Sequence, residues 1–188
     1  AERVFKAEEK IVKFITGFFV GGHEDGHCAF VQVGTRVALG PATYKGVEES
    51  KADLSIVVAV PERLDPEALR VFLLGYIASL TRDLTLGKDA AKRPYYNGGL
   101  VSLNIMYEVG LLDIGDDGYL EEPDLSAEKM AEFFKRSRAV FRELALAYDH
   151  LSHDEAAAYG EKYYQETPLT GYLLDKMELG PHAPIAMT

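Results

Sequence analysis

The chain has 188 residues, 47% of them hydrophobic, which predicts a single folded domain with a sizeable core. Its formal net charge is -10 at pH 7, and its isoelectric point is about 5.0. Nucleic acids and anionic membranes repel an acidic protein, so we expect neither as a partner. Cys28 is the only cysteine of the sequence, which excludes an internal disulfide and favours a cytoplasmic protein.

The first 44 residues carry signals for β structure. Residues 28–33 and 36–39 are rich in strand-forming side chains around Gly34, which predicts a small β element. Residues 7–16 could form either a strand or a short helix.

Residues 19–30 could be helical instead. Three glycines, Gly21, Gly22 and Gly26, oppose a helix there, because each glycine inside a helix costs about 1 kcal/mol. Two interpretations of this segment therefore stay open, a helix or a loop followed by a strand.

The middle of the chain, residues 45–166, is predicted to be a helical core, so the fold class is mainly α. Residues 47–60 resemble a buried helix, although their β-branched side chains would also suit a strand. Asp65 and Pro66 are typical of a helix start, as the capping residue and the first helical residue.

Further elements follow along the core. Pro94 opens a helix that is expected to end before Gly110. The Asp-Gly pair at 117–118 predicts a hairpin turn. A long amphipathic helix is expected over 126–148, and a last helix begins with a capping box at Ser152.

We therefore treat residues 1–188 as one domain with three parts. These are a motif-bearing N-terminal segment (1–44), the helical core (45–166) and a tail (167–188). The tail contains three prolines and is expected to be extended.

A metal-site pattern lies in the N-terminal segment. His23, Glu24 and His27 form the sequence H-E-x-x-H, and Glu49 follows His27 by 22 residues. Two histidines and a later glutamate can bind zinc and leave one coordination position open. Glu24 would then act as a general base towards water, and Asp53 would accept the second ring N–H of a zinc histidine.

Residues 48–53, with the sequence E-E-S-K-A-D, resemble the E-E-x-[KR]-A-[DE] helix of the dipeptidyl peptidase III family of zinc metallopeptidases and its bacterial relatives. The similarity continues in the same order to the C-terminal part of the chain. It includes residues 86–110, 117–130 and 156–163. This part of the chain would correspond to the C-terminal catalytic region of the family.

The resemblance implies a helical catalytic domain with one zinc ion held by His23, His27 and Glu49. It also implies a peptide substrate and a partner chain or oligomer that completes the cleft. A family histidine that assists the transition state would fall near Tyr95, whose hydroxyl could donate a hydrogen bond to an oxyanion instead.

We therefore predict an enzyme, a zinc-dependent hydrolase that acts on peptides with Glu24 as general base. One alternative is a metal-dependent enzyme of another kind, or a small-molecule-binding protein, on the same helical core. The other is a helical interaction module without a metal.

Overall fold

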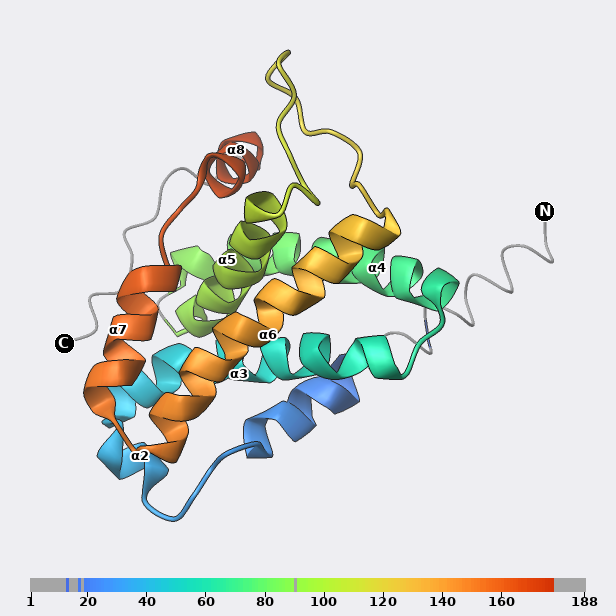
Figure 1. Ribbon diagram of the computed structural model, residues 1–188. Helices are drawn as coiled ribbons and strands as arrows, with labels where there is room; N and C mark the ends of the chain where they lie inside the picture. The colour runs from blue at the N-terminus through green and yellow to red at the C-terminus, as the bar shows by residue number, and fades with distance from the viewer. Residues whose placement is uncertain (1–12, 14–16, 18, 90, 178–188) are drawn as a thin grey trace.

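The computed structural model describes residues 13, 17, 19–89 and 91–177, and it is mainly helical, as predicted (Figure 1). These residues contain no β-strand, and an isolated antiparallel bridge joins Ile114 to Leu120. The expected element at 7–16 lies outside the described residues, apart from Lys13. Within the described part of the chain, no helix is long and apolar enough to cross a membrane.

The β element expected at 28–33 and 36–39 is a wrong prediction. Residues 19–28 are helical and form what we call the histidine helix, and turns lead from it to the short helix α2 (Thr35–Ala38). The valines of this segment are exposed, and Val33 is completely so. Strand propensity reflects packing against a neighbouring strand, and no such neighbour is present here.

Helix α3 (Pro41–Ala59) lies at the centre of the molecule (Figure 1). The helices packed around it are α5 (Arg93–Glu108), α6 (Ala127–Asp149) and α7 (His153–Tyr163). Apolar residues of α3 such as Leu54 and Val57 are fully buried. Three charged residues are buried in the same helix, and such residues must find partners. They are Glu48, Lys51 and Asp53.

Capping side chains define the starts of α4, α6 and α7, as the sequence predicts. Helix α4 (Pro66–Leu84), which packs on α5, begins after Asp65, whose carboxylate accepts a hydrogen bond from the Ala68 amide at 2.9 Å. Ser126 and Ser152 cap α6 and α7 in the same way. The short 3-10 turns are η1 (Val60–Glu62) and η2 (Thr85–Lys88).

The extended tail predicted from residue 167 is also wrong in its first part. Helix α8 (Pro168–Lys176) packs against α5. Thr167 and Thr170 form a reciprocal capping box around Pro168, the first helical residue. Threonine followed by proline is a strong helix start, so the signal was present in the sequence. Residues 178–188 lie outside the described part.

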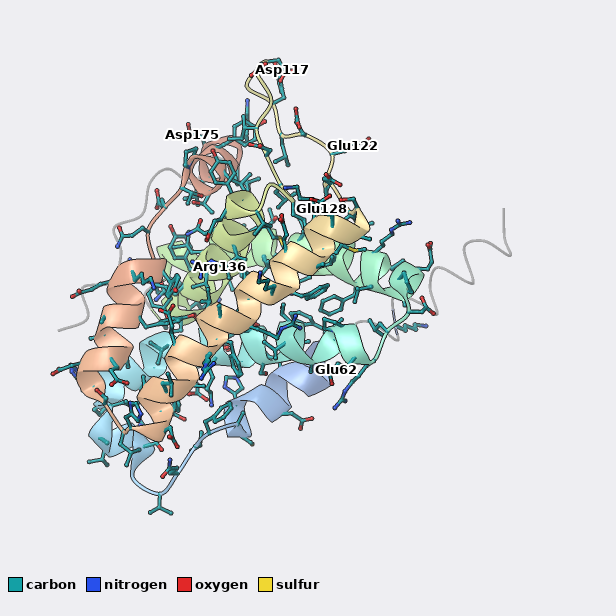
Figure 2. The ribbon with its side chains drawn as sticks, in the orientation of Figure 1. Glu62, Asp117, Glu122, Glu128, Arg136 and Asp175 are labelled. Carbon is teal, nitrogen blue, oxygen red and sulfur yellow. The ribbon has the colours of Figure 1, made fainter. Side chains whose placement is uncertain are left out.

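The predicted hairpin projects between α5 and α6, with Asp117 at its tip and Glu122 on its returning arm (Figure 2). The Gly118 amide donates to the Gly115 carbonyl at 2.8 Å and closes the turn. This hairpin stands away from the central helix α3, where the metal-binding pattern lies (Figure 1).

Candidate metal centre

The histidine helix packs directly on α3 because a glycine faces it. A Cβ on Gly26 would lie 2.2 Å from Ser55 Oγ and 2.8 Å from the backbone of Ala52. No larger residue fits at this crossing without movement. Gly26, which disfavours the helix locally, is therefore what allows the two helices to approach closely.

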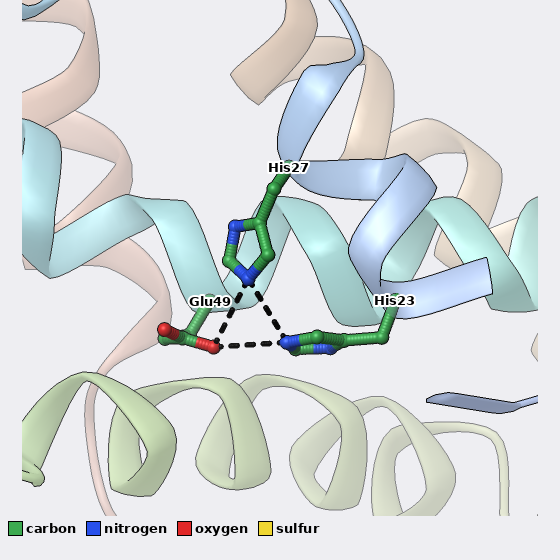
Figure 3. A group of neighbouring side chains, drawn as sticks. All are labelled: His23, His27 and Glu49. Atoms are coloured by element: carbon green, nitrogen blue, oxygen red, sulfur yellow. Dashed lines mark hydrogen bonds and ion pairs between the residues drawn. The ribbon is translucent and has the colours of Figure 1, made fainter. Parts of the chain in front are cut away.

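This packing brings His23, His27 and Glu49 together, as the H-E-x-x-H pattern predicts (Figure 3). His23 Nε2 lies 3.1 Å from Glu49 Oε2 and 3.0 Å from His27 Nε2, and His27 Nε2 lies 3.7 Å from Glu49 Oε2. Ligand atoms at zinc–ligand distances of 2.0–2.2 Å in a tetrahedron are about 3.3–3.6 Å apart. The three observed separations lie within a few tenths of an ångström of this range.

The hydrogen bonds of the two histidine rings are also compatible with metal binding. Asp53 and Glu48 each accept from an Nδ1–H, at 2.8 Å from His23 and 3.2 Å from His27. With hydrogen on Nδ1, each neutral imidazole presents a lone pair at Nε2, which is the form that binds a metal. Glu49 Oε2 is buried and lies 3.1 Å from His23 Nε2 and 3.7 Å from His27 Nε2. Once His23 has lost its second proton, two Nε2 lone pairs and one carboxylate oxygen therefore face one point.

Asp53 occupies the orienting position predicted for it. Its side chain is 7% exposed, and burial raises its pKa while the hydrogen bond from His23 lowers it. Helix α5 approaches it at Gly98, where a Cβ would lie 2.8 Å from Asp53 Oδ2. The backbone of α5 therefore lies close to Asp53, and this contact encloses the Asp53–His23 pair.

Sequence reasoning missed the group behind His27. Lys51 is fully buried, and its Nζ donates to the carbonyls of His27 at 3.0 Å and Ala29 at 2.7 Å. The same Nζ lies 3.0 Å from Glu48 Oε1, and the Tyr148 hydroxyl donates to the other Glu48 oxygen. Burial lowers the pKa of Lys51, whereas Glu48 raises it.

We call Glu48, Lys51 and Tyr148 the Glu48 network. Its effect is to hold the Glu48 carboxylate against His27 and to fasten the end of the histidine helix to α3. The spacing of three between Glu48 and Lys51 could have indicated their pairing on one helix face. No local signal indicates Tyr148, which is 100 residues away from Glu48.

A cavity of about 570 Å³ opens beside His23. Glu24, an exposed residue, and Tyr95, which is 40% exposed, both line it. The carboxylate of Glu49, with burial and Glu24, raises the pKa of Tyr95. Both side chains that were predicted to be catalytic therefore line the cavity that adjoins His23.

The far wall of this cavity belongs to α4. Arg82 Nη2 lies 3.0 Å from Asp83 Oδ1, and burial is the largest cause that raises the pKa of Asp83 to about 6. Neither residue was considered at the sequence level, because nothing local connects them to the H-E-x-x-H pattern.

Comparison of the chain with protein-family models, with curated proteins and with solved structures finds no match. The similarity to dipeptidyl peptidase III motifs accordingly remains a hypothesis that rests on the motif residues alone.

Proposed function

We propose that the protein is a zinc-dependent hydrolase, with peptides as its substrates. The observation that carries the proposal is the convergence of His23 Nε2, His27 Nε2 and Glu49 Oε2. Two imidazoles and one carboxylate are a frequent ligand set of catalytic zinc, which keeps one position open. Support also comes from Glu24 and Tyr95, which line the adjoining cavity.

His23, His27 and Glu49 would hold the metal. Bound zinc would supply Lewis-acid chemistry and lower the pKa of water. Glu24 accepts a proton from the attacking water as the water oxygen bonds to the carbonyl carbon. It then passes this proton to the leaving amine as the carbon–nitrogen bond breaks.

The other residues hold atoms in place during this reaction. The Tyr95 hydroxyl donates to the oxygen that gains negative charge. Asp53 and Glu48 keep hydrogen on each Nδ1, so that both Nε2 lone pairs stay directed to the same point. The cytoplasmic location and a partner chain that extends the cleft are further parts of the hypothesis.

The test begins with zinc content, measured on protein purified without a histidine tag, and continues with peptide hydrolysis with and without chelator. Glu24→Gln should retain one zinc per chain and lose about 10²–10⁴-fold in rate, because glutamine cannot accept the proton. Asp25→Asn is the matched control, since Asp25 is the next residue and lines a different cavity. It should hydrolyse peptides like the parent.

Each other outcome has a separate meaning. Protein that neither contains nor takes up a divalent metal would refute the proposal and favour a helical interaction module. A chain that binds zinc but cleaves no peptide would favour a metal-dependent enzyme of another kind. Loss of zinc in the Glu24→Gln variant would make Glu24 a ligand or a structural residue.

A further inference from the structure

Two cavities meet at the metal centre, and their charges differ. The larger one contains His23, Glu24 and Asp53, and the smaller one, about 300 Å³ in volume, contains Glu48 and Glu49. Tyr95 lines both cavities. A substrate held at the metal therefore has room on two sides.

Two cations of the smaller cavity have no acidic partner among the described residues. Arg36 of α2 and Lys45 of α3 line it, and neither forms a salt bridge with any residue that the structure describes. The charge of Arg36 acts inside the cavity: burial and Glu48 raise the pKa of Tyr44, whereas Arg36 lowers it.

The acids of the smaller cavity do not neutralise these cations. Glu48 is bound to His27, Lys51 and Tyr148. Glu49 is the proposed metal ligand, so its charge is balanced by the metal. With the metal in place, the cavity presents two positive charges to a ligand.

The larger cavity has the opposite character. Its acidic side chains include Glu24, which is exposed, and Asp83, which is partly balanced by Arg82. A peptide carries a positive amine at one end and a carboxylate at the other. The charge difference between the cavities orients such a molecule across the metal, with its carboxylate towards α2.

We infer that the smaller cavity binds the free carboxylate of a short peptide, with Arg36 and Lys45 as specificity-determining residues. The inference rests on the proposed function and adds its substrate class, peptides that end close to the bond that is cleaved. Arginine suits this task because its guanidinium can donate two parallel hydrogen bonds to one carboxylate.

The test measures binding and needs no turnover. The protein is loaded with Co(II), whose visible absorption reports a thiolate joining the metal. The probes are mercaptoacetyl-glycine and mercaptoacetyl-glycyl-glycine, each paired with its C-terminal carboxamide. Each pair differs only in the carboxylate, and the two lengths place it at two distances from the metal.

We expect one carboxylate probe to bind the parent about tenfold or more tightly than its carboxamide, as a hydrogen bond to a charged group implies. Arg36→Gln and Lys45→Gln should each reduce this preference about tenfold and leave carboxamide binding unchanged. Arg142→Gln and Lys135→Gln, at exposed positions of α6, remove the same charges elsewhere and should change neither affinity.

Three results would overturn the inference. Equal binding of acid and amide at both lengths would show that the cavity does not select a carboxylate, while the bound Co(II) would leave the proposed hydrolase intact. If the α6 control variants lost the carboxylate preference to the same extent, the preference would be an effect of the protein's net charge and not of this cavity. Failure to bind Co(II) would remove the metal centre, and both proposals with it.

Discussion

The two histidines of the candidate metal centre are oriented by different means. Behind His23 stands Asp53, which is enclosed by the close approach of α5 at Gly98. Behind His27 stands Glu48, which is held by a buried lysine and a tyrosine from α6. One side relies on tight helix packing, and the other relies on a polar network. The comparison teaches that one ligand geometry can depend on close helix packing at one histidine and on a buried polar network at the other.

The largest effect that we expect is a loss of folding stability when the Glu48 network behind His27 is disrupted. Lys51→Met would leave Glu48 buried without its counter-charge and release the carbonyls of His27 and Ala29. Removing one partner of a buried ion pair typically costs about 3–5 kcal/mol. Urea unfolding of the metal-free protein measures this loss, with the exposed Lys135→Met as control. Equal unfolding midpoints for Lys51→Met and the parent would contradict the role given to Lys51.

The next comparison removes the two carboxylates. Asp53→Ala and Glu48→Ala should each weaken zinc binding by about 10–100-fold, because each frees one histidine to rotate. Glu48→Ala should also produce the larger fall in the free energy of unfolding, since Lys51 then has no counter-charge. Zinc titration and urea unfolding of both variants separate the two effects. A titration of Asp53→Ala that overlays the parent would make Asp53 an ordinary packed residue.

The residues that orient His23 and those that orient His27 also differ in how well they could be predicted from the sequence. The H-E-x-x-H residues lie on the histidine helix, and Glu49 and Asp53 lie on α3, with only the short α2 between the two helices. Their convergence could therefore be predicted from spacing in the sequence. Helix starts at Asp65, Ser126 and Ser152 could be predicted too, because a cap is a property of a few adjacent residues.

The remaining features depend on tertiary contacts. The pairing of Glu48 with Tyr148 and the place of Asp83 beside the cavity need helices that are distant in sequence. Gly26 is a second example, since its local cost is visible in the sequence and its contact with Ser55 is not. The strand predicted at 28–33 failed for the same reason, because strand propensity cannot show whether a partner strand exists.

A smaller effect concerns the pH dependence of zinc binding, which follows from the pKa of His23. In the metal-free protein, burial lowers the pKa of His23, but Asp53 and Glu49 outweigh it and raise the pKa from 6.5 to about 10. Zinc must displace this proton, so the apparent zinc affinity should rise about tenfold per pH unit between about pH 7 and pH 9. Competition titrations with a chelator of known pH dependence measure this slope, and a flat profile would contradict the assignment.

The raised pKa of His23 also makes the stability of the metal-free fold depend on pH, and the direction of this dependence follows from the shift. The folded-state pKa lies above the unfolded value, so the protonated imidazole stabilises the fold fully below about pH 6.5. This contribution is lost as the pH rises through about 10. Metal-free His23→Gln protein should show less of this alkaline loss than the parent in melting experiments.

The smallest effect separates the glycines of the histidine helix. A Cβ on Gly21 would have no atom within 4 Å, so Gly21→Ala should stabilise the protein by about 1 kcal/mol or less through helix propensity. Gly26→Ala should instead destabilise it and weaken zinc binding, because its Cβ would collide with α3. Melting temperatures of the two variants test this. Equal shifts in the same direction would mean that the helices do not meet at Gly26.

The acidic residues around the centre also have a kinetic consequence. Glu24 and Asp53 line the cavity beside His23, and Glu49 lies 3.1 Å from His23, in a protein whose net charge is -10. A divalent cation that diffuses towards the cavity is therefore accelerated before it meets any ligand atom. The association rate of zinc should be high in dilute buffer and should fall as added salt screens these charges over about 10 Å. The carboxylates would thus determine how quickly the protein captures a scarce ion, as well as how tightly it holds one.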